Sequence, residues 1–380
     1  MHVLILPTRY PNWYNQESNI FFKDQAEALA SQNTKVSILA LIPITIQDIL
    51  RKKTLKFGLE IIESKGITTY RYLFPVPPKS KWIQQIIRCV VGKYLLKKYI
   101  LKDKIPDVVH VHTFIAANLA IHLKTKYNIP YVITEHSSIF LRGLATNYDI
   151  KLAQKAFQSS NRNIAVSQNF KHILEDLFKS KFVYIPNVVD TNFFRPTNVD
   201  KYRNFTILNI ANLNPNKNQK LLISSFSKIH ESFPNIKLRI GGEGPERENL
   251  NSLILELGLE EEVTLLGKLT RSGVLAEMQQ SHVFALTSKF ETFGVVLVEA
   301  MACGVPVIST KCGGAESIVE SNVNGILIEE TLFDKGLTTL IENYSTYDSK
   351  GIVLNVEKQF SNTSVISQLL TVYKDQVIND

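Results

Sequence analysis

Short β-branched runs alternate with longer amphipathic runs along this chain, and the alternation starts again near the middle. In the first half we expect a helix at 21–31 and strands at 2–6, 36–41, 107–112, 131–134 and 162–166. In the second half we expect a helix at 221–230 and strands at 205–210, 237–240, 263–266, 283–286 and 305–309. Strands that alternate with helices favour parallel sheets built of βαβ units. The sequence therefore predicts two Rossmann-like, doubly wound α/β domains.

A turn-rich stretch at 186–196 separates the two halves. A length of 380 residues also exceeds the usual size of one domain. We place a first domain at 1–190, a second at 191–360 and a final helix at 361–380. Ligands of doubly wound sheets bind at the carboxyl ends of the strands, so a binding cleft is expected there.

Composition and charge limit the classes of function. The apolar run at 2–6 is too short for a signal peptide or a membrane span, and three cysteines without metal-type pairing favour a reducing compartment. We expect a cytoplasmic protein or one at the inner face of the cell membrane. Residues 1–190 hold 26 Lys and Arg against 13 Asp and Glu, whereas the remainder holds 17 against 22. Because no nucleic-acid-binding motif accompanies the basic half, we expect an anionic substrate or membrane and no nucleic acid.

The segment 79–104 concentrates this charge. Its basic residues are Lys79, Lys81, Arg88, Lys93, Lys97, Lys98, Lys102 and Lys104, against Asp103 alone. A helical wheel gathers Ile83, Ile86, Ile87, Val90, Tyr94 and Leu101 on one side, with Trp82 at the margin. The wheel gathers Lys81, Arg88, Lys98 and Lys102 on the other. Two interpretations stay open: a surface helix packed on its own domain, or a basic face that rests on anionic lipid.

Two carboxylates frame an expected helix start near the C-terminus. Glu291 lies in a turn closed by Gly294, and Glu299 lies about one and a half turns into the helix that follows. The unpaired N–H groups of a helix start attract phosphate or sugar oxygens. Carboxylates on either side can hold hydroxyl groups, and a nucleotide diphosphate-sugar offers both. The alternative is a helix entry with two solvated acids.

This segment, with Phe-Gly inside it and EAMACGVPV after it, resembles the retaining glycosyltransferases of family 4, which have the two-domain GT-B fold. The resemblance covers nearly the whole chain and is most specific at 205–327. It implies transfer of a sugar from a nucleotide diphosphate-sugar to a glycan or lipid-linked acceptor, with retained anomeric configuration. It implies no metal or other cofactor, and a last helix that crosses back to the first domain. Another GT-B enzyme, such as a 2-epimerase or phosphorylase, and a non-catalytic binding protein stay open.

The resemblance assigns the diphosphate to one loop. In the family this loop has the form G-R-L-x-P-x-K, and residues 211–217 read ANLNPNK. Lys217 matches the family lysine, which neutralises the diphosphate, and Asn212 replaces the arginine. Gly242 and Gly244 occupy the position of the phosphate-side loop.

The resemblance also assigns the rest of the donor. It implies that Glu299 binds the ribose and that Glu291 binds hydroxyl groups of the transferred sugar. Leu269 stands where the family packs the base, although core packing explains it equally well. Backbone N–H groups would reach sugar or phosphate from Phe293, Gly294 and Val295.

On the acceptor side the resemblance singles out His136, which follows the expected strand 131–134 and would lie near the reacting centre. We therefore expect His136, Glu291 and Lys217 to be catalytic. His110 and His112 share one strand face, where a place in the core or cleft wall is favoured over metal ligation. In the loop at 11–20, Asn19 stands where the family has glycine, and Trp13 with Tyr14 would shape the acceptor pocket.

Overall fold

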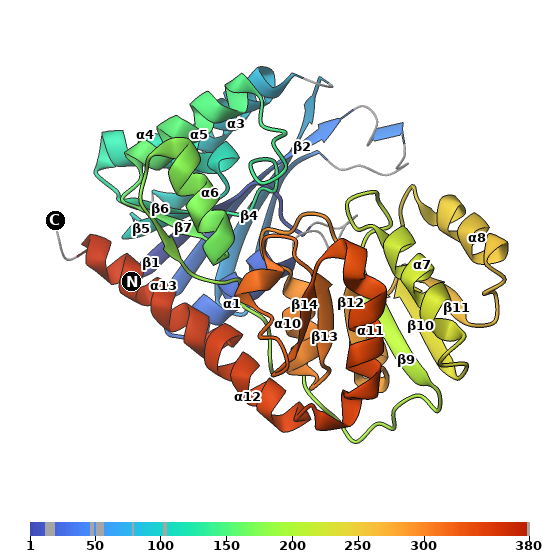
Figure 1. Ribbon diagram of the computed structural model, residues 1–380. Helices are drawn as coiled ribbons and strands as arrows, with labels where there is room; N and C mark the ends of the chain where they lie inside the picture. Colours follow the sequence, from blue (N-terminus) through green and yellow to red (C-terminus); the bar gives the residue numbers. More distant parts are fainter. Residues whose placement is uncertain (12–19, 46–48, 51–56, 78–79, 102–104, 378–380) are drawn as a thin grey trace. The chain divides into compact units, whose positions relative to one another are not determined.

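A computed structural model describes residues 1–11, 20–45, 49–50, 57–77, 80–101 and 105–377, and it contains two compact units (Figure 1). Unit 1 comprises 1–166, 171–188 and 365–380, and unit 2 comprises 167–170 and 189–364. Each unit is an α/β sandwich around one sheet. The expected pair of Rossmann-like domains is confirmed, and the chain passes between units on either side of the short segment 167–170 and again next to Val188 and Val365.

The sheet of unit 1 has the order β3-β4-β2-β1-β5-β6-β7-β8. All neighbours are parallel except β3 and β4, which form a hairpin. The strands are β1 (His2–Pro7), β2 (Lys35–Thr45), β3 (Gly58–Ser64), β4 (Ile67–Val76), β5 (Val108–His112), β6 (Tyr131–Glu135), β7 (Arg162–Ala165) and β8 (Phe182–Tyr184). The strand order reverses between β1 and β5, where a doubly wound sheet leaves room for ligands.

Helices cover both faces of this sheet. They are α1 (Ile20–Ala30), α3 (Lys81–Leu95), α4 (Ala117–Tyr127), α5 (Asn147–Ser159), α6 (Gln168–Phe178) and α13 (Asn362–Val377). The last of these helices packs Ile366, Leu369 and Tyr373 into the core of unit 1, and the Tyr373 hydroxyl forms a 2.6 Å hydrogen bond with Nδ1 of His110. The expected return of the C-terminal helix to the first domain is confirmed.

The sheet of unit 2 is parallel throughout, in the order β11-β10-β9-β12-β13-β14. The strands are β9 (Phe205–Ile210), β10 (Ile236–Gly241), β11 (Val263–Gly267), β12 (Val283–Leu286), β13 (Val307–Thr310) and β14 (Gly325–Ile328). The helices are α7 (Gln219–His230), α8 (Arg247–Glu256), α9 (Arg271–Gln280), α10 (Val295–Ala302), α11 (Phe333–Glu342) and α12 (Ser349–Phe360). Its strand order reverses between β9 and β12, so the loops after these two strands lie side by side.

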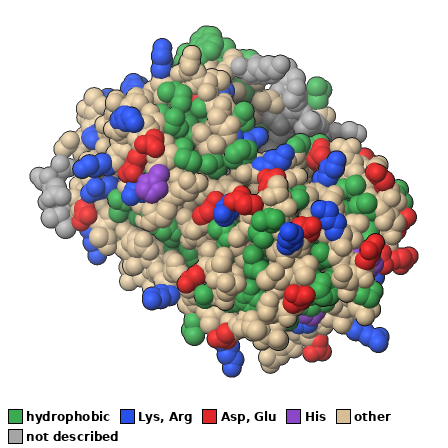
Figure 2. Space-filling view, in the orientation of Figure 1, with side chains coloured by type: hydrophobic (Ala, Val, Ile, Leu, Met, Phe, Trp, Pro, Cys, Tyr) green, Lys and Arg blue, Asp and Glu red, His purple; other side chains and the backbone are tan. Residues whose placement is uncertain are grey.

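The basic segment does not present the face that the helical wheel predicted. It forms α3 and a short π-helical turn, Leu96–Ile100, on unit 1. Ile86, Val90 and Tyr94 are exposed, whereas Arg88 is buried. Hydrophobic side chains stand at the surface near the top of Figure 2, where Figure 1 places α3. The predicted basic outer face with an inner isoleucine face is therefore wrong; Lys79, Lys102 and Lys104 lie outside the described residues.

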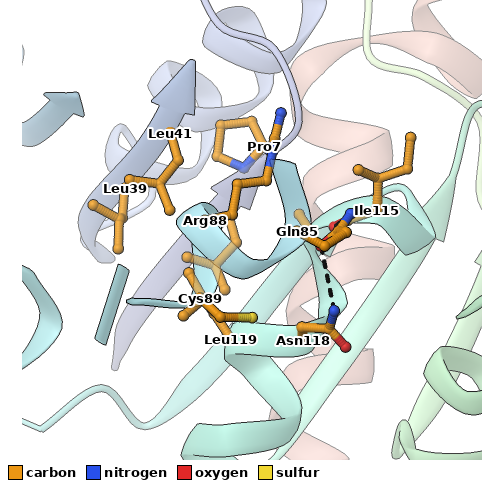
Figure 3. A pocket seen from close by; sticks show the side chains of 11 residues that line it. Pro7, Leu39, Leu41, Gln85, Arg88, Cys89, Ile115, Asn118 and Leu119 are labelled. Carbon is orange, nitrogen blue, oxygen red and sulfur yellow. Dashed lines mark hydrogen bonds between the residues drawn. The ribbon is translucent and has the colours of Figure 1, made fainter. Parts of the chain in front are cut away.

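Arg88 points inward because the end of β1 offers it an acceptor. Its guanidinium donates to the carbonyl of Thr8 at 3.3 Å, and Gln85, one turn earlier, donates to the carbonyl of Ile115 at 2.9 Å. Both side chains line a small pocket between α3 and the strands β1 and β2 (Figure 3). Burial lowers the pKa of Arg88 to about 10. Among the described residues, no helix is both long enough and apolar enough to cross a membrane.

Candidate functional site

The predicted donor residues Lys217 and Glu291 come together in unit 2. Lys217 ends the loop after β9, and Glu291 lies in the loop after β12, which is the adjacent strand at the reversal of the sheet. The Lys217 ammonium forms an ion pair with Oε1 of Glu291, and Ser288 donates its hydroxyl to the same oxygen at 2.7 Å. The structure therefore places a cation and a carboxylate, both partly exposed, at the point where doubly wound sheets bind ligands.

Backbone hydrogen bonds hold these two loops in place. The N–H of Lys289 donates to the carbonyl of Asn216 at 2.8 Å, and the Thr287 hydroxyl donates to the carbonyl of Lys217 at 3.0 Å. The N–H of Glu291 donates to the carbonyl of Cys312, beyond β13, at 2.8 Å. Lys217 and Glu291 thus belong to a rigid frame, which limits the entropy that a bound ligand would have to remove.

The expected helix start after Glu291 is confirmed as α10. Gly294 precedes it with φ = 104°, a left-handed conformation that favours glycine. The Phe293 side chain is buried and contacts Phe360, so only the backbone of Phe293 could contact a sugar or phosphate group. Val295 begins the helix, and half-buried Glu299 follows slightly more than one turn later. The first turn of α10 has N–H groups without partners inside the helix, and the two carboxylates lie on either side of it along the chain.

Gly242 and Gly244 have a packing role that the sequence did not reveal. A Cβ on Gly242 would lie 1.8 Å from the carbonyl oxygen of Ala211, and one on Gly244 would lie 2.1 Å from that of Leu213. The N–H of Gly242 donates to the carbonyl of Gly267 at 2.8 Å. These glycines let the loop after β10 press against the loop that carries Lys217. Contact between them and a donor stays a prediction.

The two other donor residues differ in exposure. Asn212 is exposed, and its carbonyl accepts a hydrogen bond from the Gln219 side chain at 3.3 Å. Leu269 is half-buried and packs against Gly241. A Cβ on Gly241 would lie 2.7 Å from Cδ1 of Leu269. Asn212 is therefore accessible to an anion, whereas Leu269 has a packing partner and still shows part of its side chain to solvent.

In unit 1, His136 follows β6 and belongs to a row of three imidazoles, of which those of His110 and His112 are fully buried and that of His136 is half-buried. Its Nε2 lies 3.1 Å from Nδ1 of His112, and the ring of His112 lies 4.3 Å from that of His110. Burial lowers the pKa of His136 and of His110 to about 3, and that of His112 well below 6.5. All three rings are therefore neutral near pH 7, and His136 can act there through hydrogen bonds only. The row confirms the core interpretation of His110 and His112.

Glu135, which the sequence did not single out, holds the turn that carries His136. Its carboxylate is fully buried and accepts the N–H groups of Phe114, His136 and Ser137 at 2.9, 3.0 and 2.8 Å. Burial raises the pKa of Glu135 to about 7, although the three N–H groups oppose this rise. A buried acid at a strand end was the available signal for this residue. For Ser288, the signal was its place two residues after β12 and three residues before Glu291.

Trp13, Tyr14 and Asn19, expected on the acceptor side, lie outside the described residues. Among the described residues, no group of three or more His, Cys, Asp or Glu side chains is arranged to hold a metal ion.

Two family models match adjacent parts of the chain. Residues 19–193 match Glycosyltransferase Family 4, and residues 190–350 match Glycosyl transferases group 1. A component of the human phosphatidylinositol N-acetylglucosaminyltransferase is 27% identical over 323 residues, which are 83% of this chain and 62% of that protein. The corresponding proteins of Arabidopsis thaliana and Schizosaccharomyces pombe are each covered over 58% of their length. The chain thus spans about three fifths of these relatives.

Solved structures show the same fold. Sucrose-phosphate synthase from Thermosynechococcus elongatus superposes with a TM-score of 0.82 at 17% identity and with complete coverage of both chains. HepE from Anabaena, in complex with UDP, superposes with a TM-score of 0.75 at 20% identity, over 99% of this chain and 100% of that one.

Proposed function

Because the chain belongs to the family 4 glycosyltransferases of the GT-B fold, we propose that it transfers a sugar from a nucleotide diphosphate-sugar to a glycan or lipid-linked acceptor. The observation that carries the proposal is the Lys217–Glu291 pair at the strand reversal of unit 2, followed along the chain by the start of α10. Anionic groups bind at such a helix start, and a lysine close to it adds a full positive charge.

In the proposed mechanism, Lys217 and the first N–H groups of α10 hold the diphosphate. Lys217 leaves its ion pair with Glu291 and neutralises the charge that develops on the leaving group. The freed carboxylate of Glu291 accepts hydrogen bonds from the sugar, and Glu299 accepts them from the ribose. A carboxylate suits both tasks because it can accept two hydrogen bonds from a vicinal diol.

His136 takes part in this proposal as a neutral group near the reacting sugar. Its imidazole contacts Nδ1 of His112 through Nε2 and carries no charge near pH 7, so we assign it a hydrogen-bonding role and no role as a cation. We propose retention of the anomeric configuration, with departure of the diphosphate from the face that the acceptor attacks. The diphosphate then helps to remove the acceptor proton, and no protein nucleophile or metal ion is required.

Relatives suggest which substrates to test first. The structure of HepE holds UDP, and the name of the human relative gives N-acetylglucosamine as the sugar and phosphatidylinositol as the acceptor. We therefore propose that the donor is a UDP-sugar. We also propose a lipid-linked acceptor in preference to a soluble glycan. The reaction would take place in the cytoplasm or at the inner face of the cell membrane.

A screen of nucleotide release tests this function. The protein is incubated with a panel of nucleoside diphosphate-sugars, with and without membrane lipid extract, and the free nucleoside diphosphate is measured. The proposal expects release from one class of donor, strongly stimulated by the extract, with the sugar found on an acceptor. An epimerase or phosphorylase would convert a sugar without any such acceptor. A binding protein would retain the donor unchanged.

A further inference from the structure

The helix α3 has two faces of different character. Its inner face, formed by Gln85, Arg88, Gly92 and Leu95, packs on unit 1. A Cβ on Gly92 would lie 2.4 Å from Cδ1 of Leu119, so α3 lies very close to α4. Figure 3 shows Arg88 beside Pro7 at the end of β1, and Gln85 joined to Asn118 of α4 by a hydrogen bond. These contacts fix the rotation of the helix and decide which side chains face solvent.

The outer face of α3 is an apolar stripe. Trp82, Ile86, Val90 and Tyr94 follow each other at intervals of four residues, which places them along one side of a helix. Their exposed fractions are 59%, 52%, 64% and 58%. Isolated apolar side chains are common on surfaces, but four large ones in a row mark a surface that contacts something else.

Lysines border one end of this stripe. Lys93, Lys97 and Lys98 are exposed, and Lys98 donates to the Tyr94 hydroxyl at 3.0 Å. Residues 81–100 contain no Asp or Glu. Lys155, on the neighbouring helix α5, adds positive charge close to α3. Burial raises the pKa of the Cys89 thiol, and the nearby charges of Lys93 and Lys155 oppose this rise. Lys81 is not available, because it pairs with Asp149 at 2.6 Å.

We propose that the stripe Trp82–Ile86–Val90–Tyr94 inserts into the headgroup region of an anionic lipid bilayer, with Lys93, Lys97 and Lys98 on the lipid phosphates. Three features favour a bilayer over a protein partner: an apolar stripe along one exposed helix face, aromatic side chains of the kind found at membrane interfaces, and a border of one charge sign. This inference rests on the proposed lipid-linked acceptor, because it would hold unit 1 at the surface that carries such an acceptor.

The proposal reverses the polarity that the sequence alone indicated. The helical wheel predicted that the basic face of the helix contacts the membrane. In the proposal from the structure, the apolar stripe contacts the membrane and the lysines lie at its edge. Arg88 takes no part, since it is buried. Binding should therefore depend on both apolar insertion and charge, and it should persist in part at a salt concentration that removes a purely electrostatic contact.

Vesicle co-sedimentation of the full chain tests the stripe. Vesicles of phosphatidylcholine with one third phosphatidylglycerol should sediment the protein, whereas pure phosphatidylcholine should bind it much more weakly. Val90→Ser with Ile86→Ser should remove most of the binding. Leu354→Ser is the matched control, because Leu354 in α12 has the same exposed fraction as Val90, 64%. Equal sedimentation of the stripe variant and the wild type would overturn the proposal.

Charge reversal tests the border. Each lysine near an anionic surface contributes about a five-fold change in the partition coefficient, so Lys93→Glu with Lys97→Glu should reduce binding at least about twenty-five-fold. Lys350→Glu with Lys358→Glu, on exposed sites of α12, makes the same charge change and should have little effect. Equal losses in the two variants would show a general effect of net charge and would overturn the specific surface.

Two further measurements distinguish membrane binding from self-association and from the proposed enzymatic function. A concentration-dependent dimer in sedimentation velocity that disappears in the Ile86→Ser, Val90→Ser variant would assign the stripe to a second copy, and it would overturn the proposal. Nucleotide release is measured for the same variants with a water-soluble acceptor analogue. If vesicle binding follows the predictions while no donor is ever consumed, the proposed enzymatic function fails and the membrane surface stands.

Discussion

At the scale of single residues, the proposed donor site assigns a different task to each of its two glutamates. The sequence predicted Glu299 and Glu291 as parts of one motif. In the structure, Lys217 forms its ion pair with Glu291. If Glu299 binds the ribose, Glu299→Ala should weaken binding of UDP by about ten- to a hundred-fold, which corresponds to the loss of one charge-assisted hydrogen bond, about 1.5–3 kcal/mol. Isothermal calorimetry measures the affinity, and Glu357→Ala, at an exposed position of α12, is the control. Unchanged affinity in the folded Glu299 variant would refute the ribose assignment.

Glu291 should affect turnover more than nucleotide affinity. We expect Glu291→Ala to lower kcat by at least about ten-fold, because its partner in the transition state is the sugar. The Kd for UDP should change little or become smaller, because Lys217 is then released from its ion pair. Equal losses in kcat and in UDP affinity would contradict this division of tasks.

Asn212 replaces the arginine of the G-R-L-x-P-x-K loop, and it is exposed. Asn212→Arg should tighten UDP binding, with a larger gain at low salt, because a guanidinium binds phosphate through paired hydrogen bonds and its charge is screened by salt. Asn249→Arg adds the same charge at an exposed site on α8. If both variants bind UDP equally well, the loop after β9 does not reach the phosphates.

At the scale of elements, the two histidines of β5 and His136, directly after β6, make unit 1 sensitive to acid. The unfolded chain protonates His110, His112 and His136 near pH 6.5, whereas the folded chain does not do so until much lower pH. Their contribution to the free energy of unfolding is therefore complete above pH 6.5 and is lost as the pH falls toward 3. Glu135 acts in the opposite direction: its raised pKa of about 7 adds stability as the pH falls from 7 to 4.5.

Three imidazoles outweigh one carboxyl group, so the free energy of unfolding of unit 1 should fall between pH 6.5 and pH 5. Each net proton changes it by about 1.4 kcal/mol per pH unit. Urea unfolding monitored at several pH values checks this, and His112→Asn should reduce the slope by about one proton. A free energy of unfolding that is constant from pH 7 to pH 5 would contradict the buried neutral histidines.

The contact between the loops after β9 and β10 depends on glycine. Gly244→Ala places a Cβ 2.1 Å from the carbonyl oxygen of Leu213, a backbone atom that cannot move alone. We expect a loss of about 1–3 kcal/mol in the free energy of unfolding and weaker UDP binding through displacement of Lys217. Gly273→Ala in α9, where the nearest atom would lie at 3.4 Å, should be neutral or stabilising. Equal stability of the two variants in urea would contradict the packing role.

The sequence predicted those elements whose pattern reflects burial. The strands β1, β5, β9 and β12 are runs of buried β-branched and apolar residues, and their predicted limits agree with the structure within one residue. The hairpin of β3 and β4 was not predicted, because β3 is largely exposed and carries charged residues between its apolar ones. The signal for this hairpin was the turn at Lys65-Gly66, where both residues have positive φ.

The rotation of α3 could not be predicted from the sequence, because a helical wheel sorts residues by type and not by contact. Arg88 is drawn inward by a carbonyl 80 residues away in the sequence, and its burial turns Ile86 and Val90 outward. In the same way, the motif located Lys217 and Glu291, but their ion pair and the hydroxyl of Ser288 depend on the strand order of unit 2.

At the scale of the whole molecule, the residues proposed for catalysis are divided between the two units. His136 belongs to unit 1, whereas Lys217, Glu291 and Glu299 belong to unit 2. His136→Ala should therefore lower turnover and leave the Kd for UDP nearly unchanged. His172→Ala, on exposed α6, is the control. Wild-type turnover in the His136 variant would leave this histidine a purely structural role.

The most direct test of the central proposal is the transfer of a radiolabelled sugar to lipid extract, from the donor that the release screen identifies. The wild type should place the label on an acceptor. Lys217→Ala should reduce the rate by at least about a hundred-fold, because the leaving diphosphate loses its cation. Lys289→Ala, which removes an exposed lysine from the adjoining loop, should leave the rate nearly unchanged. Label found only as free sugar, or equal rates for Lys217→Ala and the wild type, would contradict the account.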